Sequence, residues 1–380
     1  MFFLITILFI TMLLYCGIIL WLTIGNIFST HSSQPSKFPS ISVIVAIRNG
    51  EHALLYLIKD LLAQKYPGSL EFILVDDESE DQTGEIIKNI SKKDNRFIYE
   101  TSKKGDISLL MKKKALDAGI KRANYEWLLF TDVDCRVPST WVRGISRYFK
   151  KNNDYVIGYS SVRSGSSLLN KFQSLDYFLL LISARGASHF KHPLACTGQN
   201  QAYRKSIFNK VGGFTKINKQ IQGDDSLFLN ICKKWGNAVI VFADHTDCHV
   251  IARQEKTWRS LLKQRIRWSG DANIMYRINF SFYLMLLGFF VLHCALISLF
   301  FISIFYPFFF TVLVKFLSIK FSVEFFLYFT GSRQLDKSID FLEFIAWNII
   351  HIPYIVLMGI CSFFAEKISW KGRKLHSLML

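Results

Sequence analysis

Two hydrophobic patterns divide the chain. Long apolar runs without charged side chains lie near both ends, and short apolar runs separated by polar stretches fill the middle. Residues 1–25 contain no Lys, Arg, Asp or Glu, and a helix of this length can cross a hydrocarbon layer of about 30 Å. The run lacks the positively charged start and small-residue cleavage site of a signal peptide. We therefore expect a retained transmembrane anchor over residues 1–28.

A second apolar region occupies residues 279–366. Its first part, 280–314, has no charged side chain, and Tyr306-Pro307 predicts a helix break within it. Another apolar run follows Asp340. The region is expected to hold two or three membrane spans, and a basic tail, residues 367–380, comes after it.

The number of these spans depends on residues 316–331. This stretch is apolar but contains Lys320 and Glu324, so it predicts either a further span or an interfacial helix. An even number of spans would bring the basic tail to the same side of the membrane as the polar middle. The sequence leaves both alternatives open.

The middle of the chain, residues 38–255, alternates short runs rich in β-branched residues with longer stretches of helical spacing. This rhythm predicts an α/β fold with a mostly parallel sheet and right-handed crossovers. Strands are expected at 42–47, 72–75, 96–100 and 127–132, and helices at 52–64, 112–122 and 205–210.

Acidic pairs follow two of these strands, Asp76-Asp77 in one case and Asp132 and Asp134 in the other. Each pair alone is compatible with a turn or a solvated strand end, but ligands of such sheets bind outside the carboxyl ends of the strands. If the chain stays extended, Asp132 and Asp134 point the same way and repel unless a cation bridges them. Because a divalent ion completes its shell with phosphate oxygens and water, the pattern predicts a metal–diphosphate site.

The charges concentrate in the same middle segment. Between Lys37 and Arg277 lie 38 of the 46 Lys and Arg residues and 24 of the 29 Asp and Glu residues, so this segment has a net charge of +14. A basic surface suits anionic lipid or phosphorylated substrates, and no nucleic-acid-binding motif is found, so nucleic acid is not an expected partner. The positive-inside rule favours a cytoplasmic location for this segment.

The seven cysteines are scattered without a CxxC pair, which favours reduced thiols over a disulfide framework. The HTDCH segment offers His245, Cys248 and His249 as possible metal ligands. Without a second ligand cluster, a structural role is the better prediction for it.

A basic amphipathic stretch precedes the C-terminal apolar region. An ordinary surface helix would show the same pattern, but its position next to the membrane segments predicts an interfacial helix within residues 256–278. The residues near its less polar face are Trp258, Leu261, Leu262, Arg265 and Ile266.

Between Ser42 and Asp271, seven segments in order resemble the membrane-bound, inverting family 2 glycosyltransferases, whose domain has the GT-A fold. Each motif is weak by itself, and their order between apolar segments carries the resemblance. The segments are ISVIVAIRNG, VDDESEDQT, KKKALDAGIKRA, TDVDC, TGQNQAYRKSIFNKVGGF, GDDSLFL and QRIRW.

The resemblance implies roles on the donor side of a reaction. Asp76 or Asp77 would bind the base or ribose of a nucleotide-sugar, and Lys112 would approach the nucleotide. Asp132 would contact the donor, and Asp134 would ligate Mg²⁺ or Mn²⁺, which neutralises charge on the departing diphosphate.

The resemblance also implies roles in catalysis and closure. Asp225 would be the general base, with the adjacent Asp224 as the alternative. Three residues of QRIRW would close over the diphosphate and the acceptor: Gln264, Arg267 and Trp268.

Two positions depart from the family pattern, since Met111 replaces the usual glycine before Lys112, and Asp224 replaces the usual glutamate. The neighbours Lys113 and Lys114 are expected on a solvated helix face.

The chain is thus expected to be an integral membrane enzyme with a cytoplasmic catalytic domain. The resemblance implies transfer of a sugar, first expected from a UDP-sugar, with inversion to a lipid-linked or glycan acceptor in cell-surface polysaccharide or glycolipid synthesis. A processive polysaccharide synthase is the alternative, although three or four spans are few for a polymer channel. A non-catalytic membrane scaffold of the same fold is disfavoured by the intact acidic set. The sugar and the acceptor stay open.

Overall fold

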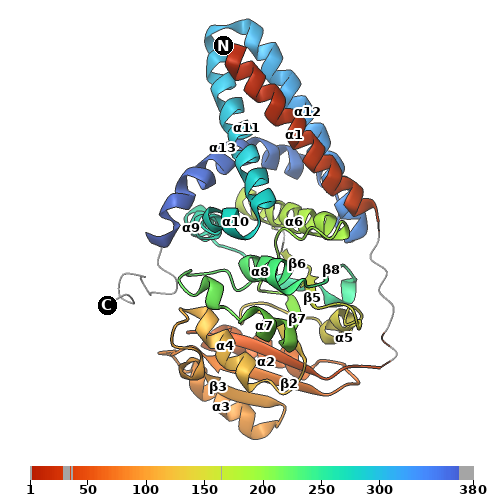
Figure 1. The fold of residues 1–380 in the computed structure, drawn as a ribbon, viewed down its shortest axis with the longest axis vertical. Coiled ribbons are helices and arrows are strands. Elements are labelled where there is room, and N and C mark those ends of the chain that lie inside the picture. The colour runs from red at the N-terminus through yellow and green to blue at the C-terminus, as the bar shows by residue number, and fades with distance from the viewer. Residues whose placement is uncertain (1, 29–34, 36, 164, 368–380) are drawn as a thin grey trace. The chain divides into compact units, whose positions relative to one another are not determined.

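The computed structural model describes residues 2–28, 35, 37–163 and 165–367. They divide into two compact units (Figure 1). Residues 37–163 and 191–254 form one, called here the sheet unit, and residues 2–28, 165–190 and 255–367 form the other, the helical unit. The predicted basic tail beyond Lys367 lies outside the described residues.

A seven-stranded sheet is the centre of the sheet unit. Its strands lie in the order β3 (Phe97–Thr101), β2 (Leu70–Asp76), β1 (Ile41–Ile47), β4 (Trp127–Phe130), β7 (Gln201–Arg204), β5 (Tyr155–Gly158) and β8 (Ile240–Ala243). All neighbouring pairs are parallel except those of β7, which is antiparallel to both β4 and β5. The predicted mostly parallel α/β sheet is therefore confirmed. A separate parallel pair joins β6 (Ser160–Val162) to β9 (Val250–Ala252).

Continuous apolar runs explain why the central strands are buried. In β1 and β2 nearly every residue is enclosed, and all four residues of β4 are, as expected where helices cover both faces of a parallel sheet. The helices of this unit bury apolar residues at helical spacing. They are α2 (Glu51–Leu62), α3 (Thr83–Lys93), α4 (Lys112–Arg122), α5 (Trp141–Ser146), α7 (Lys205–Val211) and α8 (Ser226–Gly236), with short 3₁₀ turns η1 (Ser102–Lys104), η2 (Thr215–Ile217) and η3 (Thr246–Cys248).

The seven strands and helices predicted from the sequence are all present, and their ends differ from the observed ends by at most two residues. The direction of β7 was not foreseen, and it matters for the site. Phe130 at the end of β4 pairs with Gln201 at the start of β7. The loop before β7 therefore reaches the same edge of the sheet as the chain after β4, and we call this edge the carboxyl edge.

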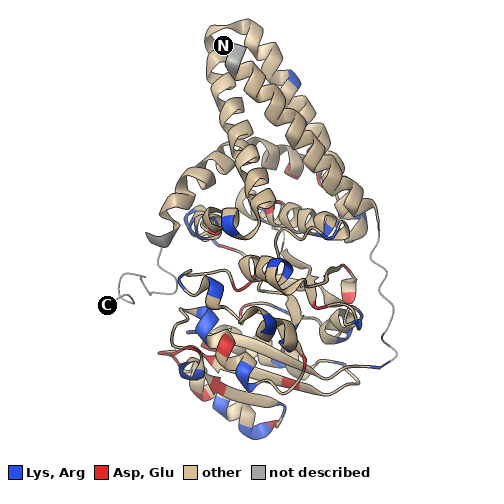
Figure 2. Cartoon of the chain, viewed as in Figure 1, with Lys and Arg blue, Asp and Glu red and all other residues tan. Residues whose placement is uncertain are grey.

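Long apolar helices build the helical unit. They are α1 (Phe2–Ile27), α6 (Leu168–His189), α9 (Trp258–Ser269), α10 (Ala272–Ile278), α11 (Phe280–Phe305), α12 (Pro307–Gln334), α13 (Phe341–Cys361) and the 3₁₀ segment η4 (Ser362–Lys367). Helices α1, α11 and α12 run side by side (Figure 1). Charged residues are sparse on α1 and α11 (Figure 2). The break predicted at Tyr306-Pro307 is confirmed, because α11 ends at Phe305 and Pro307 begins α12.

In the part of the chain that the structure describes, three helices are long and apolar enough to cross a membrane: residues 4–27, 280–305 and 341–365. The first lies within the predicted anchor and the other two within the predicted C-terminal region. Helix α12, which contains the undecided stretch 316–331, does not meet the same composition limit.

Two charged residues of α12, Lys320 and Glu324, nevertheless face the inside of the helical unit. Lys320 and Glu324 are four residues apart on one helix face, form an ion pair of 2.8 Å and are buried. The Glu324 carboxylate also accepts hydrogen bonds from Tyr15 of α1 and from Asn348 of α13. Lys320 and Glu324 therefore both have charged or polar partners inside the helical unit.

Helix α6 lies inside the range 38–255 expected for the polar domain, but it packs with α1 in the helical unit. The helices approach closely at two glycines, since a Cβ on Gly25 would lie 2.1 Å from the Gly186 carbonyl oxygen. The predicted helix over 256–278 is also divided, into α9 and α10, near Gly270.

Candidate active site

Lys112 joins two of the acidic segments at the carboxyl edge. It is the first residue of α4, and its Nζ lies 2.8 Å from Asp132 Oδ1 and 3.0 Å from Asp224 Oδ2. Asp132 follows β4, and Asp224 lies two residues before α8 begins. Three residues predicted for the site thus come together from three separate segments.

This cluster pairs one lysine with two aspartates and is partly open to solvent. Burial lowers the pKa of Lys112, but the charges of Asp132 and Asp224 together raise it above its ordinary value, so the ammonium stays protonated. The side chains of Lys112 and Asp132 are 20% and 27% exposed. A small polar ligand can therefore reach these groups.

Asp225, next to this cluster, has the properties of a general base. It is the N-cap of α8, where Oδ1 accepts a hydrogen bond from the Ser226 backbone N–H at 2.6 Å. Burial and then the charge of Asp224 raise its pKa to about 6, although Lys112 and backbone donors lower it. A base works best when its pKa lies near the working pH, so this carboxylate is better suited to proton transfer than an ordinary aspartate.

The loop before β7 closes over the acidic pair. The Gly198 backbone N–H donates to Asp225 Oδ2 at 3.2 Å, and Gln201 Nε2 donates to the Asp224 carbonyl oxygen at 3.2 Å. A Cβ on Gly198 would lie only 3.1 Å from Lys112 Nζ. Sequence reasoning singled out this segment but not Gly198, because a glycine has no side chain to suggest a role.

At the end of β2, the two acids contribute to a tight turn. Asp76 Oδ1 accepts a hydrogen bond from the Ser79 backbone N–H at 3.1 Å. Asp77 is 3% exposed, and its main-chain carbonyl accepts from Arg48 Nη1 at 2.9 Å. These contacts place both acids at the expected edge of the sheet, while their role in binding a nucleotide stays a prediction.

The chain does not stay extended through Asp132 and Asp134. It turns after β4, and the Cys135 backbone N–H donates to the Asp132 carbonyl oxygen at 3.1 Å. The alternation argument that placed both carboxylates on one side therefore does not apply. Asp134 is partly exposed within this turn.

The chain around Asp134 fits a divalent cation that takes most of its ligands from outside the protein. Among the described residues, no group of three or more His, Cys, Asp or Glu side chains could hold a metal ion. An all-protein metal cage is thus not present in that part of the chain. One partly exposed carboxylate instead fits an ion that takes its other ligands from water and a bound diphosphate.

Two features at the start of α4 differ from expectation. Met111 has φ 53° and ψ −139°, a backbone conformation that favours glycine although a methionine stands there. Lys113, expected on a solvated face, is fully buried. The signal for its burial was available, because Lys113 shares a stripe of helical spacing with Leu116 and Ile120, which are also buried.

The QRIRW residues lie on α9 in the helical unit. Gln264 Nε2 donates to Glu255 Oε1 at 3.2 Å. Arg265 is buried in an ion pair of 3.0 Å with Asp176 of α6, and its guanidinium lies 4.3 Å from the ring centroid of Trp268. The expected closure of Gln264, Arg267 and Trp268 over the donor stays a prediction.

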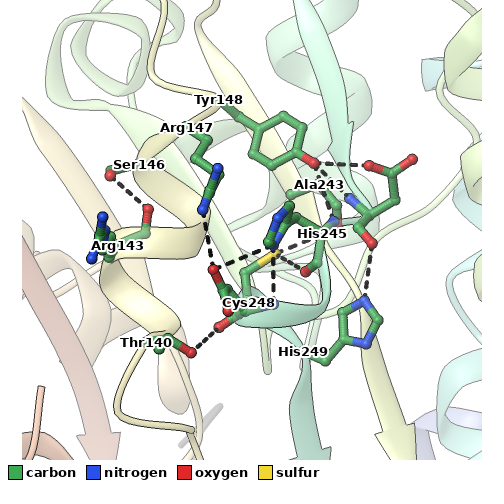
Figure 3. A network of polar contacts seen from close by, with 11 residues as sticks. Thr140, Arg143, Ser146, Arg147, Tyr148, Ala243, His245, Cys248 and His249 are labelled. Atoms are coloured by element: carbon green, nitrogen blue, oxygen red, sulfur yellow. Dashed lines mark hydrogen bonds and ion pairs between the residues drawn. The ribbon is translucent and has the colours of Figure 1, made fainter. Parts of the chain in front are cut away.

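The HTDCH segment forms a network of polar contacts around η3 (Figure 3). The buried Cys248 thiol donates to the His245 carbonyl oxygen at 2.9 Å. His245 Nδ1 accepts from the Asp247 backbone N–H at 3.2 Å, and His249 Nε2 lies 3.1 Å from the Asp244 carbonyl oxygen. The three candidate ligand atoms are directed at nearby main-chain groups, which gives the segment a structural role.

Comparisons with known proteins identify the domain. Residues 42–212 match the family described as "Glycosyl transferase family 2". The poly-beta-1,6-N-acetyl-D-glucosamine synthase of Staphylococcus epidermidis is 26% identical over 259 residues, which covers 64% of this chain. The protein of the same name from Staphylococcus aureus is 26% identical over 258 residues, with the same share covered. The match covers 58% of the length of each of these relatives.

A solved structure shows the same fold. The mannosyltransferase PcManGT from Pyrobaculum calidifontis, in complex with GDP-Man and Mn²⁺, has a TM-score of 0.58 at 16% identity, covering 95% of this chain and 97% of that chain. At this identity the likeness shows the fold alone, which is the GT-A fold expected from the motifs. With the match over residues 42–212, it shows that this chain contains a family 2 glycosyltransferase domain.

Proposed function

We propose that this protein transfers a sugar from a nucleotide-sugar, a UDP-sugar in the first instance, to a lipid-linked or glycan acceptor with inversion at the anomeric carbon. The observation that carries the proposal is the cluster of Lys112, Asp132 and Asp224 beside Asp225, at the carboxyl edge of a family 2 domain. This is the edge at which such sheets bind ligands.

In the proposed reaction, an acceptor hydroxyl attacks the anomeric carbon from the side opposite the diphosphate. The new bond joins the acceptor oxygen to that carbon, and the bond from the carbon to the diphosphate oxygen breaks. Asp225 takes the hydroxyl proton, which its raised pKa favours. The charge of Asp224 raises the pKa of Asp225 and so favours proton uptake by its neighbour.

On the donor side, Asp132 contacts the nucleotide-sugar, and Lys112 holds Asp132 and Asp224 at fixed positions. Asp76 or Asp77 accepts hydrogen bonds from the base or ribose. Asp134 would hold Mg²⁺ or Mn²⁺, which when bound supplies positive charge to the departing diphosphate.

We further propose that Gln264, Arg267 and Trp268 meet the diphosphate and acceptor from α9. Arg267 suits this role because a guanidinium can pair with phosphate through two hydrogen bonds. The sheet unit would lie in the cytoplasm, where nucleotide-sugars occur, and the apolar helices would anchor the enzyme where an acceptor lies in or passes through the membrane.

A donor screen tests this proposal. Membranes containing the full chain are incubated with individual nucleotide-sugars, with Mg²⁺ or Mn²⁺ and a lipid extract as the acceptor source. Nucleoside diphosphate release is then measured against membranes containing the Asp225→Asn variant. We expect release from at least one donor by the wild type alone. Equal release from both membranes with every donor would contradict the proposal.

Processive synthesis is the second candidate, and it is favoured by the names of the two curated relatives, which are described as synthases of a poly-N-acetyl-D-glucosamine. It is distinguished from single transfer by product length. After incubation with labelled donor, a gel ladder of long products supports processivity, and a product extended by one sugar supports single transfer.

A further inference from the structure

Lys113 is a buried lysine that the proposed reaction does not use. Its side chain has no exposed surface. Its Nζ donates hydrogen bonds to the carbonyl oxygens of Gln220 and, at 3.1 Å, of Gln222. An ammonium is costly to bury unless hydrogen bonds replace its hydration, so its contacts with this loop are a specific feature of the fold.

The loop that Lys113 holds leads directly into the acidic pair. Gly223 follows it with φ +100°, a backbone conformation that favours glycine, and a Cβ there would lie 2.4 Å from Leu227 Cδ1. Asp224 and Asp225 come next. A displacement of the carbonyls at Gln220 and Gln222 would therefore be passed on to both carboxylates.

Two adjacent lysines thus tie the start of α4 to one loop in different ways. Successive residues of a helix point about 100° apart. Lys112 reaches the Asp224 carboxylate, while Lys113 reaches the main chain just before it. Met111, which precedes both, has a backbone conformation that persists only when its surroundings enforce it. The start of α4 is therefore fixed from several sides.

We propose that Lys113 is a positioning residue: it holds residues 220–222 so that Asp224 meets Lys112 and Asp225 is presented to the acceptor hydroxyl. This inference rests on the proposed transferase function, because it concerns the placement of the base in that reaction. Because the hydrogen bonds to Gln220 and Gln222 lie in the loop before the acidic pair, we expect Lys113 to affect the chemical step rather than donor binding.

The test compares three variants with the wild type in the same membranes. Lys113→Met keeps the length of the side chain and removes its hydrogen bonds, Lys113→Arg keeps a cation, and Lys114→Met removes the neighbouring charge as the matched control. We expect Lys113→Met to lower kcat at least thirtyfold with the donor KM changed less than twofold. Lys113→Arg is expected to recover at least a third of the activity, and Lys114→Met to stay within twofold of the wild type.

The pH profile adds a readout that loss of folded protein would not change. Asp225 is faced by Asp224 and Lys112 and accepts backbone hydrogen bonds from Ser226 and Gly198. Burial contributes most to its raised pKa, so a loosened loop that admits water should move the acid limb of kcat to lower pH in Lys113→Met. The midpoint of thermal unfolding and the affinity for nucleoside diphosphate show whether the variant is folded.

Three outcomes would overturn the inference while leaving the proposed function intact. They are wild-type kcat in Lys113→Met, an equal loss in Lys114→Met, and a loss explained by unfolded protein with an unchanged pH profile. An inactive wild type with every donor would instead overturn the proposed function itself.

Discussion

Two of the lysine–carboxylate clusters in the described part of the chain use the same chemistry in different surroundings. In the helical unit, Lys320 is fully buried and pairs with Glu324, which also accepts from Tyr15 and Asn348. In the sheet unit, Lys112 pairs with two aspartates and keeps 20% of its side chain exposed. One cluster is closed by its neighbours, and the other is open on the side where a ligand would approach.

The difference separates charges that support structure from charges that can react. A closed pair has its hydrogen-bonding capacity taken up by protein groups, and removal of one partner leaves an uncompensated charge. An open pair next to a carboxylate with a raised pKa is the pattern found at functional sites. Substitutions in the two clusters should therefore have different consequences, and the predictions below run from the largest expected effect on activity to the smallest.

Asp225→Asn should have the largest effect. An amide cannot take the acceptor proton, and general base catalysis typically contributes about 10²- to 10⁴-fold. We expect kcat for diphosphate release to fall by about this factor, while binding of the nucleotide-sugar, measured by titration calorimetry, changes little. If Asp225→Asn kept the wild-type kcat, Asp225 would not be the general base.

Metal removal should come next. If Asp134 holds a divalent ion, treatment with EDTA should lower transfer at least tenfold, and Mg²⁺ or Mn²⁺ should restore it, because the ion offsets charge on the leaving diphosphate. Asp134→Asn should raise the metal concentration needed for half-maximal rate. Full activity after exhaustive chelation would contradict this role.

Lys112→Met should lower kcat by roughly ten- to a hundredfold, since two aspartates lose their shared cation. It should also move the acid limb of the rate profile upward, because Lys112 lowers the pKa of Asp225. This direction is opposite to that expected for Lys113→Met. Initial rates measured across pH would show whether the acid limbs of Lys112→Met and Lys113→Met move in opposite directions. If both limbs move the same way, the separate roles of the two lysines are contradicted.

Glu324→Gln should affect stability rather than catalysis. It leaves the buried Lys320 uncompensated, and breaking a buried ion pair costs about 3–5 kcal/mol. We expect a lower midpoint of thermal unfolding in detergent, with activity per folded molecule within twofold of the wild type. A large loss of kcat with unchanged unfolding would show that the closed cluster also takes part in the reaction.

The sheet could be predicted from sequence because its signals are local. Uninterrupted apolar runs, the helical spacing of leucines and the break before Pro307 each depend on neighbouring residues, and the corresponding elements are observed. The acidic residues were placed at the carboxyl edge by the same reasoning. The strand predicted over 127–132 ends at Phe130, because the chain then enters a turn that depends on a hydrogen bond from Cys135 rather than on composition.

The contacts that build the site were not predictable in this way. The antiparallel direction of β7 brings Gly198 to Asp225, and the ion pairs of Lys112 join residues 20 and 112 positions away in the chain. Lys113 was misassigned because its charge was weighed more heavily than its place on a buried stripe. For β7 and for the ion pairs of Lys112, the deciding information is the position of a distant segment, which no single motif contains.

The pH dependence of diphosphate release tests the central claim most directly, namely that Asp225 in the open cluster is the base. Its pKa of about 6 predicts that kcat is constant at neutral pH and falls tenfold per pH unit below about pH 6, because the carboxylate must be deprotonated to accept a proton. The Asp225→Asn variant should lose this limb, while Glu324→Gln keeps it. An identical acid limb in the wild type and in Asp225→Asn would contradict the claim.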